Sequence, residues 1–173
     1  SYAGFETQYS IEFDKNAVES LKSWKEAKKL KKEIIHADIR TVDPNAFKED
    51  QFDLLHGGPP CQSFSLIGKR GSLEDPRGQL LFEIIRFASI LKPKAILLEQ
   101  VKGLLSAPDN LGNRGGVFKL FINELEKIGY IPKWSVLLAA DYGVPQLRER
   151  VFIVATLGKN GFSFPVPTHS NDF

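Results

Sequence analysis

Short apolar segments alternate with longer amphipathic ones along this chain, and that alternation is the strongest constraint on its fold. Between residues 79 and 91, for example, apolar side chains recur at helical spacing, which predicts a helix with one buried face. Strands that alternate with helices favour a mainly parallel sheet with helices on both faces. We therefore predict an α/β fold for the whole chain.

The pattern predicts where the individual elements lie. Asp14 or Asn16 is the expected N-cap of the first helix, because either side chain can accept a hydrogen bond from the first turn. Gly129 is expected to end the last helix. Strands are predicted over residues 9–13, 33–37, 52–56, 95–98, 134–139 and 151–155, and helices over residues 14–24, 79–91 and 117–128.

Composition narrows the class of protein. The 173 residues, 42% of them hydrophobic, fit a single domain with its own core. The 23 basic and 21 acidic side chains give a net charge of +2, which is too balanced to indicate a nucleic-acid partner by itself. One cysteine excludes a disulfide framework and suits a reducing compartment. No apolar stretch has the length of a membrane span, so we expect no membrane partner.

Several polar side chains fall at the ends of predicted strands. Asp38, Cys61 and Glu99 lie just past a strand, and Glu12 lies at the end of another. Ligands of parallel α/β sheets bind at the carboxyl ends of the strands. We therefore expect these four residues to lie at one edge of the sheet and to form the functional site.

The single cysteine lies in a segment rich in glycine and proline, residues 57–65. The prolines Pro59 and Pro60 fix two φ angles, so Cys61 is held in a stiff loop, as a nucleophile requires. A lone cysteine is more often only a small buried apolar side chain. A hydrolase nucleophile is a further alternative, but it needs a partner histidine, and no spacing singles one out.

Two other segments favour the nucleophile, namely residues 98–101 with Glu99 and residues 146–150 with Arg148 and Arg150. Taken alone, these charges would be ordinary surface ion pairs. Together with Pro60-Cys61-Gln62 they follow the motif order of the DNA cytosine-5 methyltransferases. Residues 75–78 and 141–145 also look like that family, so the chain resembles it over nearly its whole length. The resemblance implies a Rossmann-like fold that depends on S-adenosylmethionine.

The chemistry of that family explains these residue types. Carbon 5 of cytosine is a poor nucleophile, and a thiolate added to carbon 6 turns the ring into an enamine that can attack a methyl donor. By resemblance, Cys61 is the nucleophile and Glu99 donates a proton to ring nitrogen 3. Arg150 would stabilise the ring oxygen, with Arg148 also close to the site. The substrate loop would comprise Pro60, Gln62 and Ser63. The sequence does not identify the base that removes the carbon 5 proton.

The resemblance also implies a pocket for S-adenosylmethionine and no metal. Glu12 would bind the ribose hydroxyls, and Phe13 would lie against the adenine ring. Asp38 would accept from the adenine amino group while Ile39 packs on the ring. Leu80 would line the same pocket. Without the family context, Phe13 and Ile39 would equally well be core residues.

The chain departs from the family pattern in three places. No glycine-rich cofactor segment precedes Ser1, and the chain ends at Phe173 before a target-recognition domain. We therefore expect residues 1–173 to be a catalytic domain that is incomplete at both ends. Gln100 stands where the family usually has asparagine. Because glutamine keeps the amide group, we expect Gln100 to hold the Cys61 loop by hydrogen bonds to its backbone.

The expected function is methyl transfer from S-adenosylmethionine to carbon 5 of cytosine in double-stranded DNA, within a restriction-modification system. The target base would be flipped out of the duplex, and a restriction endonuclease would be the companion. The location would be a bacterial cytoplasm, or a nucleus in a eukaryote. The alternatives are the same chemistry on RNA and an inactive nucleic-acid-binding regulatory module, against which Cys61, Glu99 and Arg150 argue. A nucleotide-dependent dehydrogenase would need a G-x-G-x-x-G segment, which this chain lacks.

Overall fold

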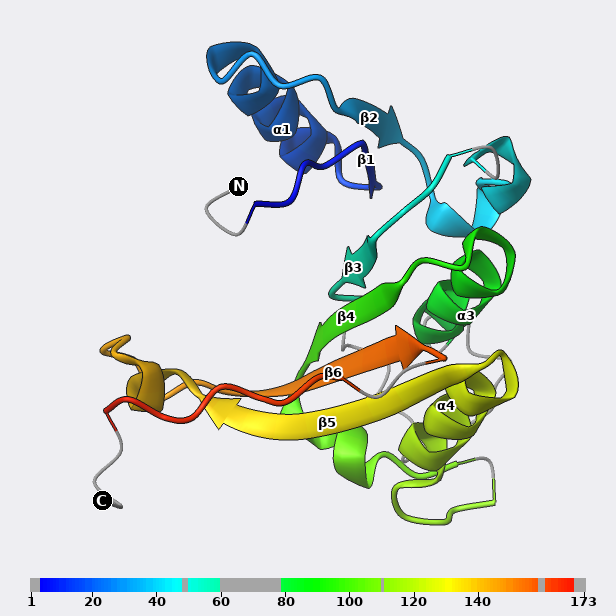
Figure 1. Ribbon diagram of the computed structural model, residues 1–173, viewed down its shortest axis with the longest axis vertical. Coiled ribbons are helices and arrows are strands. Elements are labelled where there is room, and N and C mark those ends of the chain that lie inside the picture. Colours follow the sequence, from blue (N-terminus) through cyan, green and yellow to red (C-terminus); the bar gives the residue numbers. More distant parts are fainter. Residues whose placement is uncertain (1–3, 48–49, 60–78, 110, 159–160, 170–173) are drawn as a thin grey trace. The chain divides into compact units, whose positions relative to one another are not determined.

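A computed structural model describes residues 4–47, 50–59, 79–109, 111–158 and 161–169 (Figure 1). The chain divides into two compact units, Ser1–Asp43 and Pro44–Phe173. Each unit has its own sheet. None of the helices in these described residues is both long and apolar enough to cross a bilayer.

The first unit is one strand–helix–strand motif. Strand β1 (Tyr9–Glu12) runs parallel to β2 (Glu33–His36), and helix α1 (Lys15–Ala27) connects them. Asp14 is the N-cap of α1, as predicted, and its carboxylate accepts from the backbone N–H of Ala17 at 2.8 Å. A short 3-10 helix, η1 (Ile39–Thr41), follows β2. A parallel pair requires such a crossover, and it places the carboxyl ends of both strands at the same edge.

The second unit contains a four-stranded sheet. Its strands are β3 (Leu54–Gly57), β4 (Ala95–Gln100), β5 (Tyr130–Leu138) and β6 (Glu149–Leu157), in the order β3-β4-β6-β5. Strands β3 and β4 are parallel, whereas β6 is antiparallel to both β4 and β5. Only residues 139–148 connect β5 to β6, and a parallel crossover needs about a dozen residues or more. The short connection therefore accounts for a reversal that the alternating pattern did not predict.

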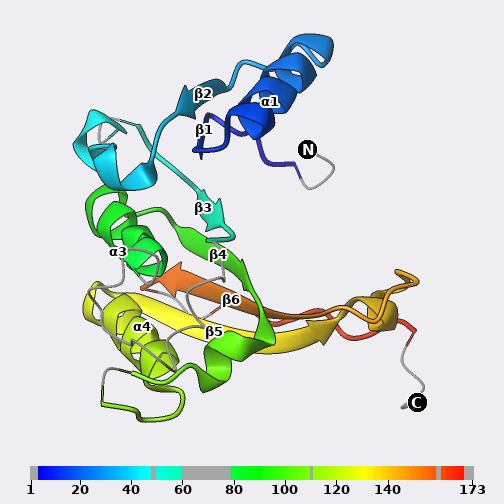
Figure 2. The ribbon, with the colours of Figure 1, turned by 180° about the vertical axis from the view of Figure 1, so that it is seen from behind.

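Helices and 3-10 turns complete this unit. Helix α3 (Gln79–Leu91) has the predicted bounds, and α4 (Gly116–Lys127) ends just before Gly129. The 3-10 turns are η2 (Pro44–Phe47), η3 (Lys102–Ser106), which follows β4, and η4 (Ala139–Tyr142), which follows β5. Both α3 and α4 lie on the same side of the four-stranded sheet (Figures 1 and 2). The predicted α/β class is confirmed.

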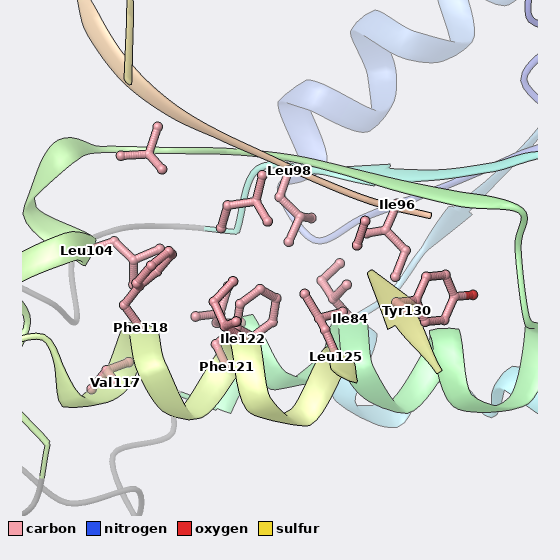
Figure 3. Packing of buried hydrophobic residues seen from close by; sticks show 14 of the residues in the cluster. Ile84, Ile96, Leu98, Leu104, Val117, Phe118, Phe121, Ile122, Leu125 and Tyr130 are labelled. Atoms are coloured by element: carbon pink, nitrogen blue, oxygen red, sulfur yellow. The ribbon is translucent and has the colours of Figure 1, made fainter. Parts of the chain in front are cut away.

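The core lies between those helices and the sheet, as Figure 3 shows. Leu98 and Ile96 project from β4 toward Phe121 and Leu125 of α4, and all four side chains are fully buried. The Phe121 ring meets Phe82 of α3 edge to face, with the ring centroids 5.9 Å apart. This packing fixes β4 in place, and with it the strand end that carries Glu99.

The Tyr130 side chain anchors the other end of the sheet. Its hydroxyl donates to the carbonyl oxygen of Pro93 at 2.7 Å, and the residue is 2% exposed. Burial raises the pKa of Tyr130 to about 12, because an apolar environment disfavours the phenolate. The neutral hydroxyl therefore ties the start of β5 to the turn before β4.

Phe121 should be one of the most costly core residues to truncate. Phe121→Ala should lower the free energy of unfolding by about 3–5 kcal/mol, because it removes a fully buried ring and leaves a cavity. Leu111→Ala is the control: Leu111 is 86% exposed, and its loss should change stability by no more than about 0.5 kcal/mol. Denaturant unfolding measures both values, and equal losses would contradict this description of the core.

Candidate active site

Glu99 lies within β4, one residue before the end of the strand, and not past it as predicted. Burial alternates along β4, so that Ile96, Leu98 and Gln100 are buried while the residues between them are partly exposed. Successive side chains of a strand point to opposite faces. The Glu99 carboxylate, 42% exposed, therefore points away from the helices and the core.

Two arginines reach that carboxylate from the beginning of β6. Arg150 Nε lies 3.1 Å from Glu99 Oε1, and Arg148 Nη2 lies 3.4 Å from the same oxygen. Because β6 is antiparallel to β4, its first residues pass the carboxyl end of that strand, with Phe152 opposite Glu99. The structure thus brings together three of the residues that the sequence nominated.

This cluster combines one carboxyl group with two cations. Arginine remains charged at any physiological pH and carries five donors in a planar fork. Such groups stabilise negative charge that develops on a bound molecule. A carboxyl group beside them accepts hydrogen bonds when ionised and can donate one when protonated. The arrangement suits addition of a nucleophile to a heteroaromatic ring.

Gln100, on the opposite face of β4, binds the loop that leads to Cys61. Its Nε2 donates to the carbonyl oxygen of Pro59 at 2.5 Å, and the residue is only 3% exposed. A Cβ built on Gly58 would lie 3.7 Å from the Glu99 carbonyl oxygen, so the loop also passes close to the strand end. The prediction that Gln100 bonds to the backbone of this loop is confirmed. The buried Gln100 Oε1 finds no hydrogen-bond partner among the described residues.

The predicted nucleophile itself, Cys61, lies outside the described residues, as do Pro60, Gln62 and Ser63. The described chain reaches Pro59, two residues before the cysteine. The contact with Gln100 therefore fixes where the loop leaves the edge of the sheet. The roles assigned to these four residues stay predictions.

The first unit carries most of the predicted cofactor residues. Glu12 ends β1 and Asp38 follows β2 by two residues, so both lie at the carboxyl edge of that sheet. Glu12 Oε1 accepts from the Asp14 N–H at 2.9 Å. The Phe13 side chain is 72% exposed next to that carboxylate. A bare aromatic ring beside a carboxylate at a strand end fits the adenine and ribose of a nucleoside ligand.

Asp38 has a partner that the sequence analysis missed. It caps η1 and accepts from Arg40 N and Arg40 Nε, both at 3.0 Å, and it forms an ion pair with the same guanidinium. These contacts, the side-chain hydrogen bonds first, lower the pKa of Asp38 to about 2. The signal was the spacing of the two residues at a helix start. An adenine amino group would share this carboxylate with Arg40.

The two remaining cofactor candidates are half-buried. Ile39 is the first residue of η1, and Leu80 is the second residue of α3 in the other unit. Each therefore has apolar surface that is partly exposed. Their contact with a cofactor stays a prediction.

An unpredicted ion pair borders the arginine cluster. Lys102 Nζ lies 2.8 Å and 3.0 Å from the two carboxylate oxygens of Glu149. Lys102 begins η3 directly beyond β4, and Glu149 begins β6. The sequence gave each residue as ordinary surface charge, since nothing in it aligned the two strand ends.

Comparison with known proteins identifies the family. The model for C-5 cytosine-specific DNA methylases matches residues 1–173. This chain belongs to that family. The type II methyltransferase M.AquIA of a Picosynechococcus strain is 37% identical over 182 residues, which cover 96% of this chain and 69% of that protein. M.NgoFVII of Neisseria gonorrhoeae is 38% identical over 97% of this chain, which spans only 43% of its length.

Solved structures support the same fold. The methyltransferase EhMeth of Entamoeba histolytica superposes with a TM-score of 0.71 at 23% identity, over 94% of this chain and 49% of that protein. These findings confirm the predicted family, the Rossmann-like methyltransferase fold and the enzyme class. The predicted cofactor, S-adenosylmethionine, is the one that the family uses.

Gln100 should matter to stability through its amide. Gln100→Leu should lower the free energy of unfolding by about 1–3 kcal/mol, because the Pro59 carbonyl would then stay buried without its donor. Gln100→Asn, which keeps the amide, is the matched control and should lose less. Thermal and denaturant unfolding provide the comparison. A leucine variant that melts with the wild type would show that this hydrogen bond is dispensable.

Asp38 should titrate well below an ordinary aspartate. Its folded pKa of about 2 lies below the model value of 3.8, so its contribution to stability is present above about pH 4 and is lost as the pH falls toward 2. Carboxyl-carbon NMR shifts of Asp38 should report a midpoint near 2. In Arg40→Gln the midpoint should rise toward the ordinary value. An unchanged midpoint in that variant would exclude Arg40 as the cause.

Proposed function

We propose that this protein transfers a methyl group from S-adenosylmethionine to carbon 5 of cytosine in double-stranded DNA through a covalent adduct with Cys61. The observation that carries this proposal is the convergence of Arg148 and Arg150 on Glu99 at the strand end to which Gln100 anchors the loop before Cys61. Membership of the C-5 cytosine-specific DNA methylase family supports DNA as the substrate.

In the first step the Cys61 thiolate adds to carbon 6 of cytosine, and electron density moves into the ring. Glu99 donates a proton to ring nitrogen 3, so that the ring accumulates less negative charge. Arg150 donates to the ring oxygen, and its charge favours the same electron flow. Its Nε and Nη1 contact Glu99 and the Glu149 carbonyl oxygen, and the guanidinium has further donors for a substrate.

Addition leaves carbon 5 nucleophilic, and elimination of Cys61 after loss of the carbon 5 proton restores the aromatic ring. When bound, S-adenosylmethionine supplies an electrophilic methyl group. Glu12 would hold its ribose and Asp38 its adenine amino group, next to the exposed Phe13 ring. Ile39 and Leu80 would supply apolar contacts.

Carbon 6 is shielded inside a base stack, so the target cytosine must leave the duplex before Cys61 can reach it. The relatives named above are type II methyltransferases. By analogy with them, we propose that the protein works in a restriction-modification system with a companion endonuclease. Its place would be the bacterial cytoplasm, or the nucleus in a eukaryote.

The covalent step can be tested by trapping. The protein in its full natural length should form a denaturant-resistant adduct with duplex DNA that contains 5-fluorocytosine, because fluorine blocks the elimination. Cys61→Ser, which exchanges sulfur for a weaker oxygen nucleophile, should form none. Denaturing electrophoresis with labelled DNA and labelled RNA distinguishes the two substrates. An adduct that persists in Cys61→Ser would refute the assignment of the nucleophile.

A further inference from the structure

The ion pair between Lys102 and Glu149 occupies a defined position in the sheet. The pairing of β4 with β6 ends where Gln100 lies opposite Val151. If that antiparallel register continued by two residues, Lys102 would lie opposite Glu149. The backbone departs there, because Lys102 begins η3, and the two side chains connect the strands in its place at 2.8 Å and 3.0 Å.

Glu149 is also the closest competitor of Glu99. It lies between Arg148 and Arg150 in the sequence, and a carboxylate is the preferred partner of a guanidinium. Both arginines nevertheless reach Glu99 Oε1, at 3.4 Å and 3.1 Å. The Glu149 carboxylate is instead engaged by Lys102 through both of its oxygens.

We infer that Lys102 is a positioning residue: by holding the Glu149 carboxylate, it leaves Arg148 and Arg150 to Glu99 and the substrate. The inference rests on the proposed function. Simple stabilisation is a poor explanation of this pair, because the two side chains are 58% and 48% exposed and exposed ion pairs contribute little to stability. Without Lys102 the arginines would divide between two carboxylates.

The sign of a double substitution tests this idea. Lys102→Gln should slow formation of the 5-fluorocytosine adduct about tenfold, whereas Glu149→Gln and the double variant should stay within about threefold of the wild type, since the competing carboxylate is gone. If the pair were only a tether, the double variant would be as slow as Lys102→Gln, and the inference would fall. Lys127→Gln breaks a comparable surface pair with Glu124 and serves as the control.

A second measurement does not depend on turnover. The Nε–H resonances of Arg148 and Arg150, assigned from Arg→Lys variants, should shift in Lys102→Gln and return in the double variant. Unmoved resonances in Lys102→Gln would overturn the inference whether or not the protein methylates DNA. If the resonances behave as expected but the wild type forms no adduct, the proposed function fails and the positioning role remains.

Discussion

The antiparallel pairing of β6 with β4 is the interaction on which the candidate site depends. It places Phe152 opposite Glu99 and brings the beginning of one strand to the end of the other. Residues about fifty positions apart in the chain therefore meet without a long loop between them. The pairing is stabilised from beneath by α3 and α4, whose apolar side chains bury Leu98 and Ile153. A hydrophobic core thus determines where charged groups converge.

The sequence predicted the elements whose signals are local. The bounds of α3 follow from its apolar period, and Asp14 is a cap because a short acid precedes a helical pattern. The hydrogen bond of Gln100 could be expected from the chemistry of an amide at a strand end. Family resemblance nominated Glu99, Arg148 and Arg150, and their proximity in space agrees with it.

Other features depend on tertiary pairing and could not be predicted. The strand β4 extends through Glu99 and Gln100, although both polar residues interrupt the apolar run by which a strand is recognised. The reversal of β6, and with it the partnership of Lys102 with Glu149, depends on which strands become neighbours. Arg40 was missed because a single pair of opposite charges two residues apart is common on protein surfaces. The predicted cysteine loop, beyond Pro59, lies outside the described residues.

The end of β4 presents neighbouring residues to opposite faces, with Gln100 directed to the loop of Pro59 and Glu99 to the arginines. In a strand, a shift of one residue exchanges the two faces completely. Insertion or deletion of a single residue within β4 would therefore place a carboxylate in the buried position and an amide among the arginines. A length change of this kind should be far less tolerated than a change of residue type at either position. Natural variation in this region is thus expected to consist of substitutions, with length differences confined to the connecting loops.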